Sequence, residues 1–126
     1  MPGAEGFAYA VLRIVPSVER GERLNVGVVL YCRRRGFLAA RVHLDEDRLR
    51  AVSPDCDPAA VRPALDSIVA VAAGDGDTPL SRLDQSDRFG WIAAPSSTIV
   101  QPSPVHTGLT TDPQADLDRL FARLVG

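Results

Sequence analysis

The chain has 126 residues, of which 45% are apolar and 24% charged, and its formal net charge is −2. A chain of this length can bury one hydrophobic core without disulfides or metal ions, so we expect a single domain over residues 1–126. All fourteen cationic residues are arginines, and sixteen acids outnumber them. This balance makes nucleic acid an improbable partner, since non-specific binding to it requires a basic surface.

The sequence contains no recognisable targeting, membrane-spanning or metal-binding signal. No apolar run reaches the roughly 18 residues of a membrane span, and residues 1–6 lack the basic start and apolar stretch of a secretory signal. We therefore expect a cytoplasmic protein that does not contact a membrane. Cys32 and Cys56 have only His43 and His106 to complete a zinc site, at irregular spacing, so we predict free thiols and no metal. No cofactor-binding motif is present, and we predict no cofactor.

Three strands are predicted in the first 44 residues. Residues 7–15 (FAYAVLRIV) are apolar at nearly every position, which is typical of a strand covered on both faces. Pro16 ends this strand, and the polar segment 17–25 is longer than a hairpin needs, so it is a candidate functional loop. Residues 26–32 and 37–44 then predict a hairpin.

The middle of the chain predicts three helices, over 45–52, 57–73 and 78–86. Each begins at an Asp or Thr that can accept a hydrogen bond from the first helical turn. In the second and third, a proline follows the capping residue and occupies a position that needs no backbone donor.

The last third of the chain combines one predicted strand with a closing helix. Residues 89–92 are expected in an irregular stretch, and residues 97–101 (STIVQ) predict a fourth strand. Two prolines within 102–108 indicate an extended but irregular segment. An amphipathic helix is predicted from about residue 111 to the C-terminus.

These elements predict an α+β fold in the order β-β-β-α-α-β-α. The sheet would be largely antiparallel, with about four strands and with the helices packed on one face. The strand over 37–44 would lie at an edge of the sheet, where it could pair with a second copy of the chain. We therefore also predict a homodimer.

Two stretches of the sequence resemble an uncharacterised bacterial family, DUF3037, a domain of unknown function. The first is YAVLRIVP…ERLNVGVV over residues 9–29, and the second is SSTIVQPSPVHTGLTTDP over residues 96–113. The resemblance implies no activity, since the family has none assigned, and at most a partnership with a HipA-like kinase. It falls on Arg13, Pro16, Glu22, Asn25, Gly27, Ser97, Gln101, Pro104, His106 and Gly108.

Arg13 is the one charged residue within the first predicted strand. An unpaired guanidinium in an apolar strand costs so much free energy that it must meet an acid or a bound anion. We favour an internal ion pair with Glu22, which would hold the loop against the sheet. The alternative is that Arg13 binds a carboxylate or phosphate of a ligand, with Glu22 as a candidate for proton transfer.

Three more polar residues complete the candidate site. Asn25 is explained by hydrogen bonds to its local backbone, but its amide could also orient a polar ligand. Gln101 is a further ligand-binding candidate because the family resemblance falls on it. His106 is a candidate general base, although a hydrogen-bonded structural histidine is the favoured interpretation.

The leading functional interpretation is a non-enzymatic interaction module whose recognition surface combines residues 18–25 with residues 102–108. The alternative is a small enzyme or ligand-binding protein that acts on an anionic substrate. A nucleic-acid adaptor would depend on the arginines at 33–35, which we interpret as a solvated turn. An enzyme should gather the polar candidates around a cavity, whereas a module should bond them to each other or disperse them, beside an exposed apolar patch. The candidates for this comparison are Arg13, Glu22, Asn25 and His106.

Overall fold

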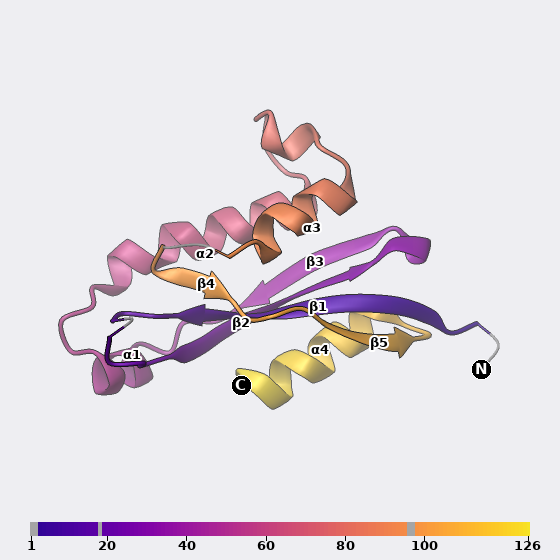
Figure 1. The fold of residues 1–126 in the computed structure, drawn as a ribbon. Coiled ribbons are helices and arrows are strands. Elements are labelled where there is room, and N and C mark those ends of the chain that lie inside the picture. The colour runs from indigo at the N-terminus through magenta and orange to yellow at the C-terminus, as the bar shows by residue number, and fades with distance from the viewer. Residues whose placement is uncertain (1–2, 18, 96–97) are drawn as a thin grey trace.

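Five strands form one antiparallel sheet in the computed structural model, which describes residues 3–17, 19–95 and 98–126 (Figure 1). The strands are β1 (Glu5–Ile14), β2 (Leu24–Cys32), β3 (Phe37–Val42), β4 (Val100–Pro102) and β5 (His106–Thr110). β2 lies between β3 and β1, while β4 and β5 pair one after the other with the opposite side of β1. The sheet therefore has β3 at one edge and β4 and β5 at the other.

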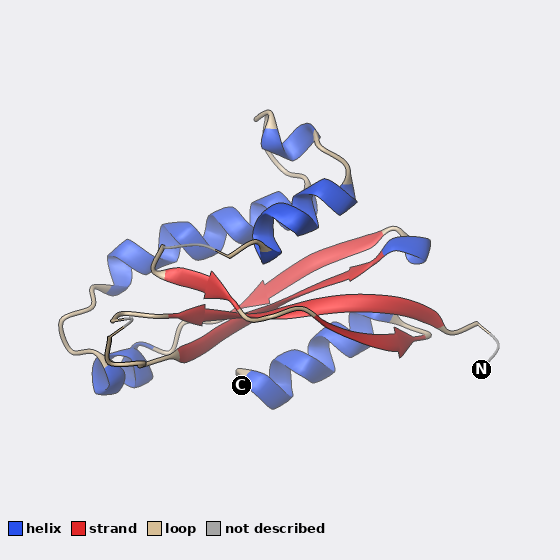
Figure 2. Cartoon of the chain, in the orientation of Figure 1, coloured by secondary structure: helices blue, strands red, loops and turns tan. Residues whose placement is uncertain are grey.

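Helices cover both faces of this sheet (Figure 2). They are α1 (Glu46–Val52), α2 (Pro58–Ala73), α3 (Gln85–Ala93) and α4 (Pro113–Leu124), with short 3₁₀ turns over Arg33–Arg35 and Leu80–Arg82. α2 and α3 lie on one face and α4 lies on the other (Figure 1). The predicted α+β class with an antiparallel sheet is confirmed, but the sheet has five strands and its helices do not lie on one face.

The two-sided arrangement follows from β2, which is apolar on both of its faces. Val29 packs into the core cluster shared with α2, whereas Val28 and Leu30 pack into the cluster shared with α4, and all three are fully buried. A strand whose side chains are apolar on both faces needs an element packed against each face. The C-terminal amphipathic helix supplies the second cover.

A β-bulge in β2 changes the pairing register with β1. Arg13 lies opposite Asn25 and Leu12 lies opposite Gly27, so β2 contains one extra residue, Val26, at this point. A Cβ at Gly27 would lie 2.9 Å from the carbonyl oxygen of Arg41 on β3. The bulge therefore brings two backbones together at a position that only glycine fits.

Helix starts agree with the capping pattern of the sequence at three of the four helices. The side chains of Asp45, Asp57 and Asp112 accept backbone hydrogen bonds at the first turns of α1, α2 and α4. The helix predicted over 78–86 is wrong, because only a 3₁₀ turn forms there. Asp84 instead caps α3.

The irregular stretch predicted for Phe89, Trp91 and Ile92 is also wrong. These residues lie in α3, where Ile92 is buried against α2 and Phe89 stacks near Tyr31 with ring centroids 5.4 Å apart. Phe89 and Ile92 are three residues apart and share one helix face, whereas Trp91 lies on another face and is 52% exposed. In the part of the chain that the structure describes, no helix is both long enough and apolar enough to cross a bilayer.

The largest difference from the sequence prediction lies in β4 and β5, which together form the edge of the sheet that we call the outer edge. The predicted strand over 97–101 is observed as Val100–Pro102, and its first residue, Ser97, lies outside the described residues. The segment expected to be irregular contains β5, which pairs with β1 from Glu5 to Tyr9. Gly108 makes this possible because the ring of Phe7 lies over it, with Cζ only 2.6 Å from where a Cβ would stand.

Candidate functional site

The three ligand-binding candidates form one row across the sheet. Asn25 on β2 and Gln101 on β4 both lie directly opposite Arg13 on β1. Paired residues of antiparallel strands share a face, with Cβ atoms about 5 Å apart. The row lies on the face covered by α4, because the side-chain amide of Asn25 donates to the carbonyl of Leu124 at 3.1 Å.

The ion pair expected between Arg13 and Glu22 is not formed. Glu22 instead pairs with Arg20, with 2.7 Å between Oε1 and Nη2. Within residues 3–17, 19–95 and 98–126, no acid lies in ion-pair range of Arg13. The loop is therefore not clamped to the sheet through Arg13, because a nearer arginine occupies the carboxylate.

The guanidinium of Arg13 is only partly satisfied. Its Nη2 donates to the carbonyl of Pro102 over a long 3.4 Å, and its Nε is buried without any hydrogen-bond partner. A buried cationic donor without a partner costs free energy that the fold must supply elsewhere. Arg13 is thus the residue of the row that has a buried donor without a partner.

Asn25 and Gln101 use their amides within the fold. The amide of Asn25 satisfies a carbonyl at the end of α4, where backbone acceptors lack helical partners. The amide of Gln101 donates to the carbonyl of Thr98 at 3.1 Å, within its own turn. Both side chains therefore have a structural role in the protein as it stands.

His106 lies away from the row, at the start of β5. It pairs with Tyr9, and the two rings stack with centroids 5.3 Å apart and an interplanar angle of 29°. Tyr9 and Arg13 are four residues apart on one strand, which corresponds to about 13 Å. His106 is exposed to solvent and therefore does not share a site with Arg13.

The two segments of the predicted recognition surface are separated in the same way. Most of the described part of the 17–25 segment lies beyond the end of β1, whereas its last two residues, Leu24 and Asn25, belong to β2 and pair with Ile14 and Arg13. The 102–108 segment runs in the opposite direction, from Leu12 towards Phe7. Val18 lies outside the described residues. The described residues of these segments therefore diverge from Arg13, which lies opposite Asn25 and donates to the carbonyl of Pro102.

The alternation of hydrogen bonds along β1 determines which backbone N–H and C=O groups of β4 and β5 point away from the sheet. The N–H of Val15 donates to Ile99, and the N–H of Ser103 donates to Val11, so odd-numbered residues of β1 bond to this edge. Pro102, opposite Leu12, then points its backbone away from β1, which is where an edge strand tolerates proline. By the same alternation, Thr107 and Leu109 of β5 direct their N–H and C=O groups outward.

The side chains of this edge are apolar and exposed. Leu109 is 72% exposed and Val105 is 46% exposed, although both are aliphatic. Residues 98–110 contain no Asp, Glu, Lys or Arg. Edge strands normally avoid association through charges, prolines or a covering element, and β5 has none of these within its five residues.

The predicted polar site residues are largely absent from the linings of the cavities in the described part of the chain. A cavity of about 280 Å³ between α2, α3 and β4 is lined mainly by apolar side chains, including Leu12, Trp91 and Val100. Gln101 contributes to the lining of a neighbouring hollow beside Pro102. The linings of four cavities in the described part of the chain do not include Arg13, Glu22, Asn25 or His106.

A comparison with protein families gives a match over nearly the whole chain. The model of DUF3037, described as a protein of unknown function, matches residues 9–125. The chain belongs to the DUF3037 family. Searches of curated proteins and of solved structures found no match. The predicted family is therefore confirmed, and the match includes β1, the outer edge and α4, although it supplies no activity.

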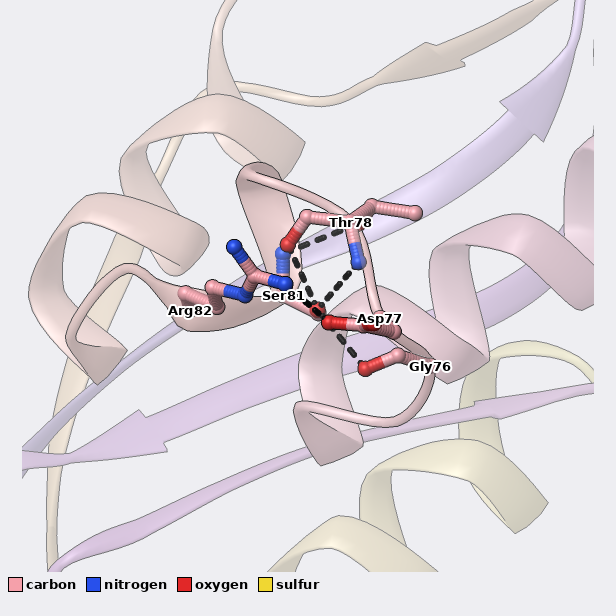
Figure 3. Close-up of polar contacts among 5 residues, drawn as sticks. All are labelled: Gly76, Asp77, Thr78, Ser81 and Arg82. Carbon is pink, nitrogen blue, oxygen red and sulfur yellow. Dashed lines mark hydrogen bonds and ion pairs between the residues drawn. The ribbon is translucent and has the colours of Figure 1, made fainter.

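A second polar cluster of this DUF3037 chain lies near the end of α2 and is structural (Figure 3). Ser81 is buried, and its Oγ donates to the carbonyls of Gly76 and Thr78. Thr78 and Ser81 also accept each other's backbone N–H, in the manner of a capping box. Asp77 pairs with Arg82 on the surface. These contacts close a turn after α2.

The cysteines and acidic groups do not form a metal site in the described part of the chain. Cys32 is buried in the α4 cluster and Cys56 is half-buried, and both are free thiols. Burial, and to a lesser extent the charge of Asp57, raise the pKa of the Cys56 thiol. No group of three or more His, Cys, Asp or Glu in the described ranges is arranged to hold a metal ion.

Proposed function

We propose that this chain is a non-enzymatic, cytoplasmic interaction module that accepts a strand of a partner protein at β5. The observation that carries the proposal is the unprotected outer edge, where Leu109 is 72% exposed beside outward-facing backbone groups. A strand that adds to such an edge gains main-chain hydrogen bonds, while its alternate side chains cover the apolar surface. Arg13, Glu22, Asn25 and His106 lie outside the linings of four cavities in the described chain, which supports a module rather than an enzyme.

The family resemblance suggests a HipA-like kinase as the partner. Co-expression of the two proteins, followed by purification through a tag on the kinase, tests this pairing directly. The informative variant is Leu109→Lys, which places a charge on the edge. The matched control is Leu83→Lys, since Leu83 is also an exposed leucine, at 42%, but lies beside α3 rather than on β5. We expect Leu109→Lys to abolish co-purification and Leu83→Lys to leave it unchanged.

Amide hydrogen exchange tests the edge independently of the partner's identity. In the free protein, the amides of Thr107 and Leu109 should exchange quickly, while that of Gly108 should be protected by its bond to β1. A bound strand should protect Thr107 and Leu109. Protection elsewhere, with these two amides unchanged, would contradict docking at β5.

The same experiment on the free protein at rising concentration tests the predicted homodimer, because self-pairing would also protect the amides of Thr107 and Leu109.

The alternative function, a small enzyme or ligand-binding protein for an anionic substrate, has one observation in its favour. The Nε of Arg13 is buried without a partner and could bind an anion. Glu22 is engaged with Arg20 and His106 lies on another part of the sheet, so neither candidate for proton transfer accompanies it. We therefore prefer the interaction module.

A further inference from the structure

The side chain of Arg13 extends towards the same edge that β5 leaves open. Its Nη2 reaches the carbonyl of Pro102, which points away from β1 at the outer side of β4. The guanidinium therefore lies across β4 at the rim of the sheet. A strand that pairs with β5 and continues past Pro104 would pass this group.

We propose that Arg13 binds a carboxylate side chain carried by the strand that adds to β5. This inference rests on the proposed function and specifies the chemistry of its partner. The buried Nε has no acceptor, and the bond from Nη2 is long at 3.4 Å. A carboxylate can accept hydrogen bonds from two N–H groups of one guanidinium at the same time, the geometry in which arginine binds anions most strongly.

The charge distribution favours a different protein over a second copy of this chain. Antiparallel self-pairing of β5 would bring residues 98–110 of the copy, which contain no Asp or Glu, to the edge, and the next acid, Asp112, already accepts a hydrogen bond at the start of α4. Such pairing would cover Leu109 but leave Arg13 without an anion. The occupant that satisfies both features is an extended acidic segment of another protein.

The fold also determines the spacing of the acid within that segment. Thr107 lies opposite Ala8, and Gln101 lies opposite Arg13, five residues further along β1. At about 3.3 Å per residue this separation is about 17 Å. The acid should therefore lie five or six residues from the residue that pairs with Thr107, on the side that passes β4.

Selection from a random peptide library tests this pattern without knowledge of the natural partner. Yeast displaying random 16-residue segments would be sorted for binding to the full chain and then re-sorted against the Leu109→Lys and Arg13→Gln variants. We expect segments that require Leu109 to share an Asp or Glu at one fixed position. For such a segment, Arg13→Gln should weaken binding about tenfold, as loss of a charge-assisted hydrogen bond does. Replacing the acid by its amide should weaken it equally, and both changes together should do no more.

Controls separate the inference from the proposed function. Arg13→Lys keeps the charge but removes the paired donors, so it should recover only part of the affinity that Arg13→Gln loses. The melting temperature of each variant reports whether it folds. If Arg13→Gln does not fold, the amide segment on the wild-type protein still gives the decisive measurement. Edge-dependent segments without a shared acid would overturn the inference alone, whereas segments indifferent to Leu109→Lys would overturn docking at β5. Binding of free glutamate or phosphate, seen as a shift of the Arg13 Nε–H resonance at millimolar concentration, would assign the site to a small ligand instead.

Discussion

The two edges of the sheet differ in how far the rest of the chain covers their side chains. β3 lies between helices, since Leu38 packs into the cluster shared with α2 while Phe37 and Ala39 pack against the cluster shared with α4. β5 exposes His106, Thr107 and Leu109 to solvent. Both strands are equally able to extend a sheet through their backbones, so the difference lies in side-chain cover. The comparison teaches that this fold covers one edge with its own helices and leaves the other exposed to solvent.

Leucine-to-alanine substitutions at the two edges should give the largest contrast. Leu38 on β3 is 7% exposed, and Leu38→Ala should lower the free energy of unfolding by about 2–4 kcal/mol through lost burial and a cavity. Leu109→Ala on β5 should change it by no more than about 0.5 kcal/mol, because the side chain is already in water. Urea denaturation followed by circular dichroism measures both values. Equal losses would mean that β5 is covered as well as β3 is.

The inner strands and the capped helices could be predicted from the sequence because their signals are local. A nine-residue stretch that is apolar at every position except Arg13 predicts β1, and an aspartate followed by proline predicts the start of α2 at Pro58. Such patterns depend on neighbouring residues only. The row of Arg13, Asn25 and Gln101 also follows from strand alternation, once the pairing is known.

The outer edge could not be predicted because it depends on contacts between distant residues. The prolines before β5 argue against a strand, but β1 is ten residues long and β4 covers only its last three, so β1 needs a second partner. Gly108 joins the sheet because Phe7 packs over it. The prediction for Glu22 failed for a different reason, because its partner Arg20 is only two residues away and exposed, and the pattern of the strand gave no signal for this local pair.

A second prediction concerns Gly27, on the side of the sheet that leads to β3. Gly27→Ala would place a Cβ 2.9 Å from the carbonyl oxygen of Arg41 and 2.8 Å from Cγ1 of Val42. A backbone atom of a paired strand cannot move away cheaply, so we expect a loss of about 2–3 kcal/mol in the free energy of unfolding. Gly6→Ala, on the same sheet but with no atom near the added Cβ, is the control and should have little effect. A loss below 0.5 kcal/mol, on the order of an ordinary surface change, would contradict the close approach of β2 and β3.

A third prediction is the corresponding change on the outer edge. Gly108→Ala would place a Cβ 2.6 Å from Cζ of Phe7, which is a side-chain atom rather than backbone. The ring of Phe7 is buried but can rotate at some cost in packing, so we expect a smaller loss of about 1–2 kcal/mol. Thermal unfolding of Gly108→Ala and Gly27→Ala under the same conditions measures the difference. A Gly108 variant less stable than the Gly27 variant would show that the outer edge is the more rigid of the two.

The smallest predicted effect concerns the cation that lies on β3. The guanidinium of Arg41 stacks over the ring of Phe121 at 4.3 Å and pairs with Asp118 at 3.0 Å, but both charged side chains are about half exposed. Arg41→Met keeps the apolar stem and removes the charge, so the free energy of unfolding should fall by only about 0.5–1 kcal/mol. Arg50→Met is the control, because its ion pair with Asp47 lies on an exposed helix surface without an aromatic ring.

This small change also tests the assignment of the two edges. Loss of the charge of Arg41 removes one feature of β3 that opposes pairing with a strand of another chain, but the helices on both faces remain in place. We therefore expect Arg41→Met to bind the partner segment of β5 with unchanged affinity and to stay at the same oligomeric state in analytical ultracentrifugation. New self-association of the variant would mean that Arg41, rather than the flanking helices, keeps the β3 edge closed, and the contrast with β5 would then depend on a single charge.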